Sequence, residues 1–183
     1  MKPIDEIISE HSSGKVQFHK REETETFGDA LEAHKGKKYV TSSNICAVLY
    51  EKIFTTRLAN ETANPESFVP AKDNIGEQLI NLLNREVQII DTEKLSFRKI
   101  TKQLVEADVL TPEEQNEYDT FYTEIRNPVA HGLTLRLYEP LLGHSPSNTF
   151  EIDANYESVY KRASEMLIDK IYKLMTVKIL RKQ

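Results

Sequence analysis

The chain is poor in cysteine, glycine and proline, with one, six and seven of these among 183 residues. Its longest apolar run, residues 45–50, is far short of the roughly 20 residues that a membrane span needs. The N-terminus interleaves acids with isoleucines, which predicts no secretory signal. A single cysteine cannot form an internal disulfide, and the apolar neighbours of Cys46 predict a buried core residue. These absences predict a cytoplasmic protein without membrane association.

A basic surplus is also absent, because 29 acidic residues outnumber 24 lysines and arginines and the net charge is −5. Broad, non-specific nucleic-acid binders gain most of their affinity from phosphate contacts and are usually basic. Any nucleic-acid chemistry must therefore depend on a local site. Hydrophobic and charged fractions of 39% and 29% are typical of a globular chain, and the length predicts a single domain over 1–183.

Helical periodicity dominates the chain. Apolar residues recur at three- and four-residue intervals over 43–60, 75–90 and 95–107, and a long final helix is predicted over 155–181. Thr111, Pro112 and Glu114 form a helix-start signal, with a capping box and a proline at the first helical position. A short helix is expected from residue 4 to about 11–14, and a helix over 24–34 and a strand over 15–20 remain open. The pattern predicts an all-α bundle of five to seven helices.

Two segments depart from this periodicity. "LTLRLY" at 133–138 alternates apolar and polar residues, and "NTFEID" at 148–153 is able to supply a second short strand. The segment between them has a loop-like composition. A small β-hairpin beside the bundle is therefore predicted. Residues 63–74, with two prolines, are expected to form a loop.

The nonapeptide "EIRNPVAHG", 124–132, places a proline between an arginine and a histidine. In an unbroken helix Arg126 and His131 would lie about 140° apart around the axis. Pro128 has no N–H for the Glu124 carbonyl and disfavours helical geometry at Asn127. We therefore expect the helix to end or kink near Asn127, which would then cap a new turn and set the relative aim of the two side chains.

The two side chains suit cleavage of RNA by its own 2′-hydroxyl. Arg126 would stabilise charge on the phosphate, and His131 would remove or deliver a proton, with no metal or cofactor. A two-fold dimer would bring two copies of each into one cleft. The alternative is structural: Arg126 stacks on Tyr122 or pairs with an acid, and His131 is a surface histidine that ends a helix.

"RNPVAH", 126–131, resembles the R-x4-6-H signature of the HEPN superfamily (higher eukaryotes and prokaryotes nucleotide-binding domains), often written RNxxxH. The resemblance covers about 75–135, with the final helix as a plausible extension to 181, and leaves 1–70 unplaced. It implies a dimeric, metal-independent endoribonuclease of the kind found in toxin–antitoxin systems, anti-phage defence and CRISPR effectors. His131 would be the acid/base residue, Arg126 the phosphate contact and Asn127 an orienting residue. Leu133 stands where the subgroup paired with nucleotidyltransferase antitoxins often has tyrosine.

The resemblance also implies partners: RNA as substrate, a second copy of the chain, and a cognate antitoxin or defence protein. The alternative function is a non-catalytic helical module for dimerisation or for binding RNA or nucleotides. Glu124 could orient a base or be a solvated helix acid. The remaining candidates are basic or histidine side chains, with a rim of RNA contacts or an exposed helix face predicted for Arg98, Lys99 and Lys102, and surface positions for His11, His19, His34 and His144.

Overall fold

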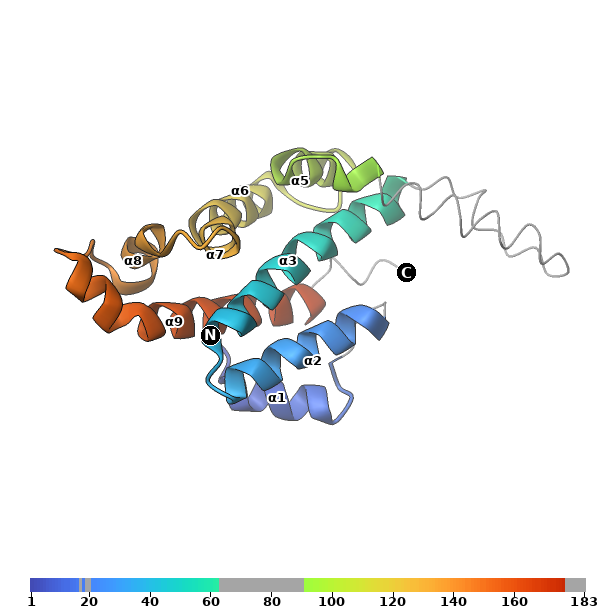
Figure 1. The fold of residues 1–183 in the computed structure, drawn as a ribbon. Helices are drawn as coiled ribbons and strands as arrows, with labels where there is room; N and C mark the ends of the chain where they lie inside the picture. The colour runs from blue at the N-terminus through green and yellow to red at the C-terminus, as the bar shows by residue number, and fades with distance from the viewer. Residues whose placement is uncertain (17, 19–20, 63–90, 177–183) are drawn as a thin grey trace, which may run out of the picture. The chain divides into compact units, whose positions relative to one another are not determined.

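A computed structural model describes residues 1–16, 18, 21–62 and 91–176. Every regular element within these residues is a helix (Figure 1), and none is a strand. The predicted all-α class is confirmed. No helix in this described part is long and apolar enough to cross a membrane. The helix predicted over 75–90, the loop over 63–74 and the last residues of the final helix lie outside the described residues.

Contacts divide the chain into two compact units, Met1–Tyr50 with Thr120–Gln183, and Glu51–Asp119. Helix α3, Tyr39–Thr62, begins in the first unit and ends in the second, and α6, Pro112–Phe121, runs from the second into the first. The second unit also contains α5, Phe97–Glu106. The first unit contains α1 (Ile4–Ser12), α2 (Arg21–Lys35), the π-helix η2 (Tyr122–Arg126), α7 (Asn127–Ala130), α8 (Thr134–Leu142) and α9 (Thr149–Thr176).

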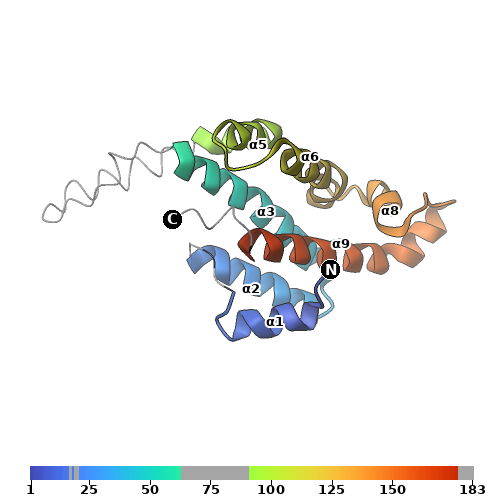
Figure 2. The ribbon, with the colours of Figure 1, turned by 180° about the vertical axis from the view of Figure 1, so that it is seen from behind.

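Helix α9 is the central element of the first unit, because it contacts α1, α2 and α8. Figures 1 and 2 show α1 and α2 side by side. The N-terminal segment is fastened to α9 by Lys2, whose backbone N–H donates to Asp169 Oδ1 at 2.9 Å. The Lys2 ammonium also donates to Tyr172 Oη at 2.8 Å and pairs with Glu10, which lowers the pKa of that carboxyl.

The second unit has an aromatic core around Phe54 of α3. Its ring meets the rings of Phe97 and Tyr118, each with a centroid separation of 5.0 Å and an edge-on geometry. The buried hydroxyl of Thr101 donates to Asp119 Oδ1 at 2.8 Å, so α5 and α6 are also joined by a polar contact. Edge-on aromatic pairs add stability beyond their buried area.

The predicted β-hairpin is wrong, because both of its segments are helical. In α8 the buried residues are Leu137, Tyr138 and Leu141, a helical spacing, whereas Leu135 is 60% exposed. The second segment begins α9, where Asn148 Oδ1 accepts the backbone N–H of Glu151 at 3.0 Å. This N-cap bond satisfies a free helix donor and outweighs a short alternating pattern.

Three further expectations change in detail. Val16 and Phe18 are buried but lie in non-strand backbone, and the helix expected over 24–34 extends over Arg21–Lys35. Val48 and Tyr156 belong to the apolar patterns that predict the buried faces of the helices over 43–60 and 155–181, but they are 61% and 42% exposed. Cys46 is fully buried, as predicted, and burial raises the pKa of its thiol.

The predicted capping box at the start of α6 is confirmed. Thr111 N–H donates to Glu114 Oε2 at 2.8 Å, and Glu114 N–H donates to Thr111 Oγ1 at 3.1 Å. We expect Glu114→Ala to lower the free energy of unfolding by about 1 kcal/mol, because one reciprocal bond is lost. Urea unfolding followed by circular dichroism measures this.

Glu113→Ala is the matched control, because Glu113 lies in the same first turn and the bonds of the box join only Thr111 and Glu114. Both substitutions remove one favourable charge from the helix start. Equal losses of stability for the two variants would show that the box contributes nothing beyond this charge.

Candidate functional site

The backbone before the motif makes a π-turn. The N–H of Asn127 donates to the Tyr122 carbonyl, five residues earlier, and Tyr122–Arg126 is a π-helix that continues into α7. A proline inside a regular helix removes one hydrogen bond, and its ring clashes with the carbonyl four residues before. A turn widened by one residue relieves this crowding around Pro128 without ending the helix.

The helix does not end near Asn127, so of the predicted end or kink only an irregularity just before this residue is present. Asn127 has φ −67° and ψ −45°, which is right-handed helical, and it is the first residue of α7. A residue with this backbone does not have the extended conformation of an N-cap, so Asn127 does not cap a new turn. The change of helical register that the proline demands occurs just upstream, in η2. The half-buried side chain of Asn127 makes no hydrogen bond or ion pair within the described residues.

Arg126 is held inside the first unit and is 9% exposed. Its Nε donates to the Ala47 carbonyl of α3 at 3.0 Å, and Nη1 donates to Tyr122 Oη at 3.0 Å. The guanidinium carbon also lies 4.9 Å from the centre of the Tyr122 ring. The contact with Tyr122 that the structural alternative predicted is present, and the Ala47 contact, 79 positions away, had no signal in the local sequence.

His131 lies at the C-cap of α7 and is exposed, as the structural alternative predicted. Its side chain makes no hydrogen bond or ion pair within the described part of the chain, so none joins it to Arg126. The helix ends in a Schellman arrangement: Leu133 N–H donates to the Pro128 carbonyl at 2.8 Å, and Gly132 N–H donates to Val129 at 3.1 Å. Gly132 has a φ of +64°, a backbone angle that residues other than glycine rarely adopt.

A hollow of about 490 Å³ adjoins the motif in the first unit. It is formed by residues of η2, α7, α8 and the segment after α8, and Pro128 of the motif is part of its wall. Its charged residues are Glu124, Arg136 and Glu139, all exposed. The volume is within the usual range for small-ligand sites. Two carboxylates beside one guanidinium suit hydrogen-bond donors of a base better than a phosphate.

The other candidates have different surroundings. Glu124 is an exposed helix acid, and the basic residues Arg98, Lys99 and Lys102 lie exposed on α5, where Lys102 pairs with Glu106 at 3.7 Å. His19 is outside the described residues. The remaining histidines each have a partner: His11 bonds to the Thr24 carbonyl, His144 to Glu151 and His34 to Ser164. His11 and His34 are half-buried and not the surface side chains that the sequence predicted.

Two substitutions separate the contributions of Arg126 to stability. Arg126→Ala should lower the free energy of unfolding by about 2–4 kcal/mol, because a buried charged donor and its packing are lost. Tyr122→Phe should cost only about 1 kcal/mol, because the ring remains and one hydrogen bond disappears. Equilibrium unfolding in urea measures both. Arg136→Ala, at an exposed arginine, is the control, and an equal effect for Arg126→Ala would contradict the anchoring role.

Gly132 gives a second test of the local backbone. A Cβ at this position would meet no atom within 4 Å, so the cost of Gly132→Ala is conformational alone, about 1 kcal/mol. Gly132→Asn should cost less, because asparagine tolerates the left-handed region. Thermal unfolding of the three proteins compares them. Identical stabilities for the alanine and asparagine variants would argue against the left-handed cap.

Comparisons of the chain with protein-family models, with curated proteins and with solved structures gave no match. The resemblance to HEPN domains therefore rests on Arg126, Asn127 and His131 and on the helices that carry them.

Proposed function

We propose that the chain is a metal-independent endoribonuclease of the HEPN type that acts as a homodimer, in a toxin or anti-phage defence role. The observation that carries the proposal is the exposed imidazole of His131 at the end of a short helix whose first turn follows Arg126 directly. An accessible imidazole five positions after an arginine fits acid–base chemistry on a phosphodiester. The resemblance of the motif adds to this support.

In the proposed reaction a 2′-hydroxyl of the RNA attacks the adjacent phosphorus. His131 removes the 2′-hydroxyl proton as the new oxygen–phosphorus bond forms, and the bond to the 5′-oxygen breaks. A second imidazole, from the partner copy, delivers a proton to that leaving oxygen. Arg126 stabilises charge on the phosphate, either by direct contact or by its field from within the fold. The products are a 2′,3′-cyclic phosphate and a 5′-hydroxyl.

The reaction uses two imidazoles, and the described residues of one chain supply a single motif histidine, His131. A second copy of the chain is therefore needed to supply the other. Exposed apolar side chains follow His131 in the chain, with Leu133 38% and Leu135 60% exposed. Apolar residues at such positions favour a covered surface over a solvated one. The proposed dimer would place this surface against its equivalent and bring the two motifs to one cleft.

One observation favours the alternative, a non-catalytic helical module for dimerisation or for binding RNA or nucleotides. The Arg126 guanidinium donates to a carbonyl and a hydroxyl of its own fold and lies over the Tyr122 ring. Such contacts suit an arginine that holds the motif against α3. On this alternative the hollow beside Pro128 would bind a nucleotide without cleaving it, and a partner would supply any activity.

The deciding experiment is an RNA cleavage assay in EDTA with a labelled single-stranded RNA. The unaltered protein should produce 2′,3′-cyclic phosphate ends, and His131→Ala should reduce the rate at least about 100-fold, the usual contribution of acid–base catalysis. Arg126→Ala and Arg126→Lys should both lose activity, because neither presents the planar donor fork. Circular dichroism of each variant establishes that it is folded.

Arg21→Ala is the control, because Arg21 is exposed on α2, which neither carries the motif nor lines the hollow beside it. This variant should cleave as the unaltered protein does. Cleavage that survives His131→Ala, or that requires added metal, would overturn the catalytic assignment. Retained RNA binding without cleavage by the unaltered protein would support the alternative instead.

A further inference from the structure

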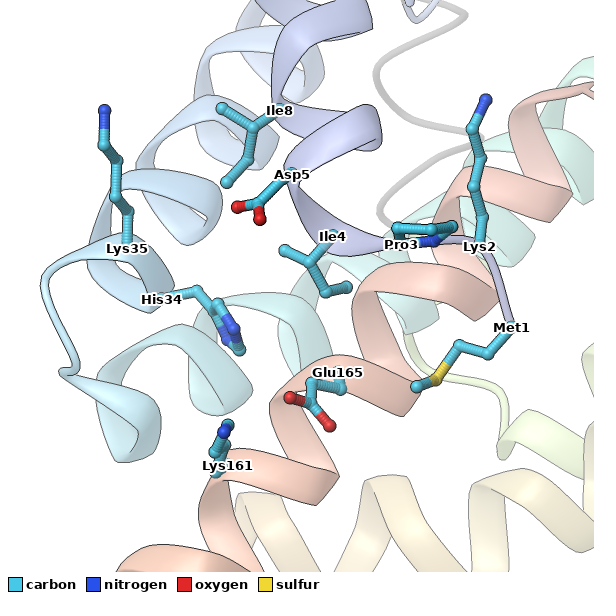
Figure 3. A pocket seen from close by; sticks show the side chains of 10 residues that line it. All are labelled: Met1, Lys2, Pro3, Ile4, Asp5, Ile8, His34, Lys35, Lys161 and Glu165. Carbon is cyan, nitrogen blue, oxygen red and sulfur yellow. The ribbon is translucent and has the colours of Figure 1, made fainter.

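A second cavity, of about 420 Å³, lies in the first unit between the start of α1, the end of α2 and the middle of α9 (Figure 3). Its apolar wall comes from the N-terminal segment and includes Ile4 and Ile8. Its polar wall includes His34, Asp5 and Glu165. Figure 3 shows these three polar side chains around the same space, although they come from three different helices.

A chain of hydrogen bonds determines which nitrogen of His34 carries the proton. Ser42 Oγ donates to the Ala30 carbonyl at 2.8 Å, and Ser164 Oγ donates to Ser42 Oγ at 2.8 Å. Both hydroxyl protons are then used, and Ser164 Oγ can only accept from His34 Nδ1, 2.8 Å away. The proton of the neutral ring is therefore on Nδ1, and Nε2 has a lone pair.

The same chain excludes a serine nucleophile. Ser164 directs its proton to Ser42 and not to the imidazole, and both serines are fully buried. A nucleophilic serine needs the opposite polarity, with its hydroxyl donating to the base, and access to substrate. The buried serines instead fix the orientation of His34, and the ring also packs edge-on against Tyr39 at 5.1 Å. His34 Nε2 makes no hydrogen bond within the described residues.

The carboxylates that share the cavity are also available. Neither Asp5 nor Glu165 has a hydrogen bond or ion pair within the described part of the chain, although both raise the pKa of His34. Burial is the larger effect and lowers that pKa below its ordinary value of 6.5, with Lys161 acting in the same direction. His34 is thus neutral at pH 7, and the three groups are all hydrogen-bond acceptors.

Two of the three lysines that line the cavity extend away from the acceptors. Lys2 is occupied by Glu6, Glu10 and Tyr172, and Figure 3 shows both Lys2 and Lys35 extending away from the three acceptors. Lys161 lies on α9 one turn before Glu165, and Figure 3 shows its side chain beside His34 and Glu165. The space between His34, Asp5 and Glu165 therefore presents three acceptors and the Lys161 ammonium to a ligand, with aliphatic side chains beside them.

We propose that this cavity binds the ammonium group of a small aliphatic amine. An ammonium has three N–H donors and no acceptor, which suits His34 Nε2 and the carboxylate of Glu165, with the carboxylate of Asp5 on the same cavity wall. The hydrocarbon part of the amine would lie against Ile4 and Ile8. Such a site is separate from Arg126 and His131 and does not depend on the proposed ribonuclease activity.

Calorimetric titration of the full chain with n-butylamine and with 1,4-diaminobutane tests this site, with 1-butanol and sodium chloride as reference probes. Both amines should bind at pH 8 and the references should not. Affinity should fall as the pH is lowered through the pKa of His34, which burial holds below its ordinary value, because the protonated ring has no lone pair for the ammonium.

Four variants give the site its residue-level test. Glu165→Gln and His34→Ala should each weaken amine binding at least tenfold, and Ser164→Ala several-fold, because the ring is then free to place its proton on Nε2. Lys161→Met should tighten binding, because a neighbouring positive charge is removed. His144→Ala, an exposed histidine elsewhere in the unit, should bind as the unaltered protein does.

Glu165→Gln keeps the size of the side chain and is only half-buried at its position, so it separates loss of binding from loss of folding. The proposal is overturned if butylamine binds no better than butanol. It is also overturned if Glu165→Gln and Lys161→Met leave the affinity unchanged, or if affinity rises on acidification.

Discussion

The hydrogen bond from Arg126 Nε to the Ala47 carbonyl joins the motif to helix α3 across 79 positions of sequence. A charged donor inside a fold needs a partner, because an unpaired buried charge is costly. Together with Tyr122, this bond sets where the short helix α7 lies and therefore where His131 reaches the surface. The hollow beside Pro128 and the exposed Leu135 follow from the same placement.

Local sequence rules predicted the elements whose determinants lie within one turn. The Thr111–Glu114 capping box is present as expected, because both of its bonds span three residues. The β-hairpin prediction was wrong because an alternating pattern over six residues also occurs by chance in an amphipathic helix. The second segment forms the start of helix α9, where Asn148 is the N-cap. The proline of the motif was recognised correctly, but its effect was absorbed by a π-turn, and local preferences do not distinguish a break from a bulge.

The sequence predicted Arg126, Asn127 and His131 as candidate site residues, whereas it predicted neither their surroundings nor those of His34. Nothing near Arg126 indicates that its guanidinium contacts Ala47, and nothing near His34 indicates Ser164, which is 130 positions away. Both contacts depend on tertiary packing of helices distant in the chain. A histidine among polar neighbours is thus a weak guide to exposure, and the tautomer of His34 follows only from a complete count of the protons on Ser42 and Ser164.

The π-turn over Tyr122–Arg126 also determines how the motif would respond to the deletion of one residue. A π-turn is a helix with one residue more than a regular turn holds, so losing a single codon there would restore regular geometry and leave the helix continuous. The helix after the turn would keep nearly the same direction around its axis, because the wider turn already absorbs the extra residue, and only the side chains of the turn itself would change their facing. Arg126 is one of these residues, so its bond to the Ala47 carbonyl depends on the extra residue.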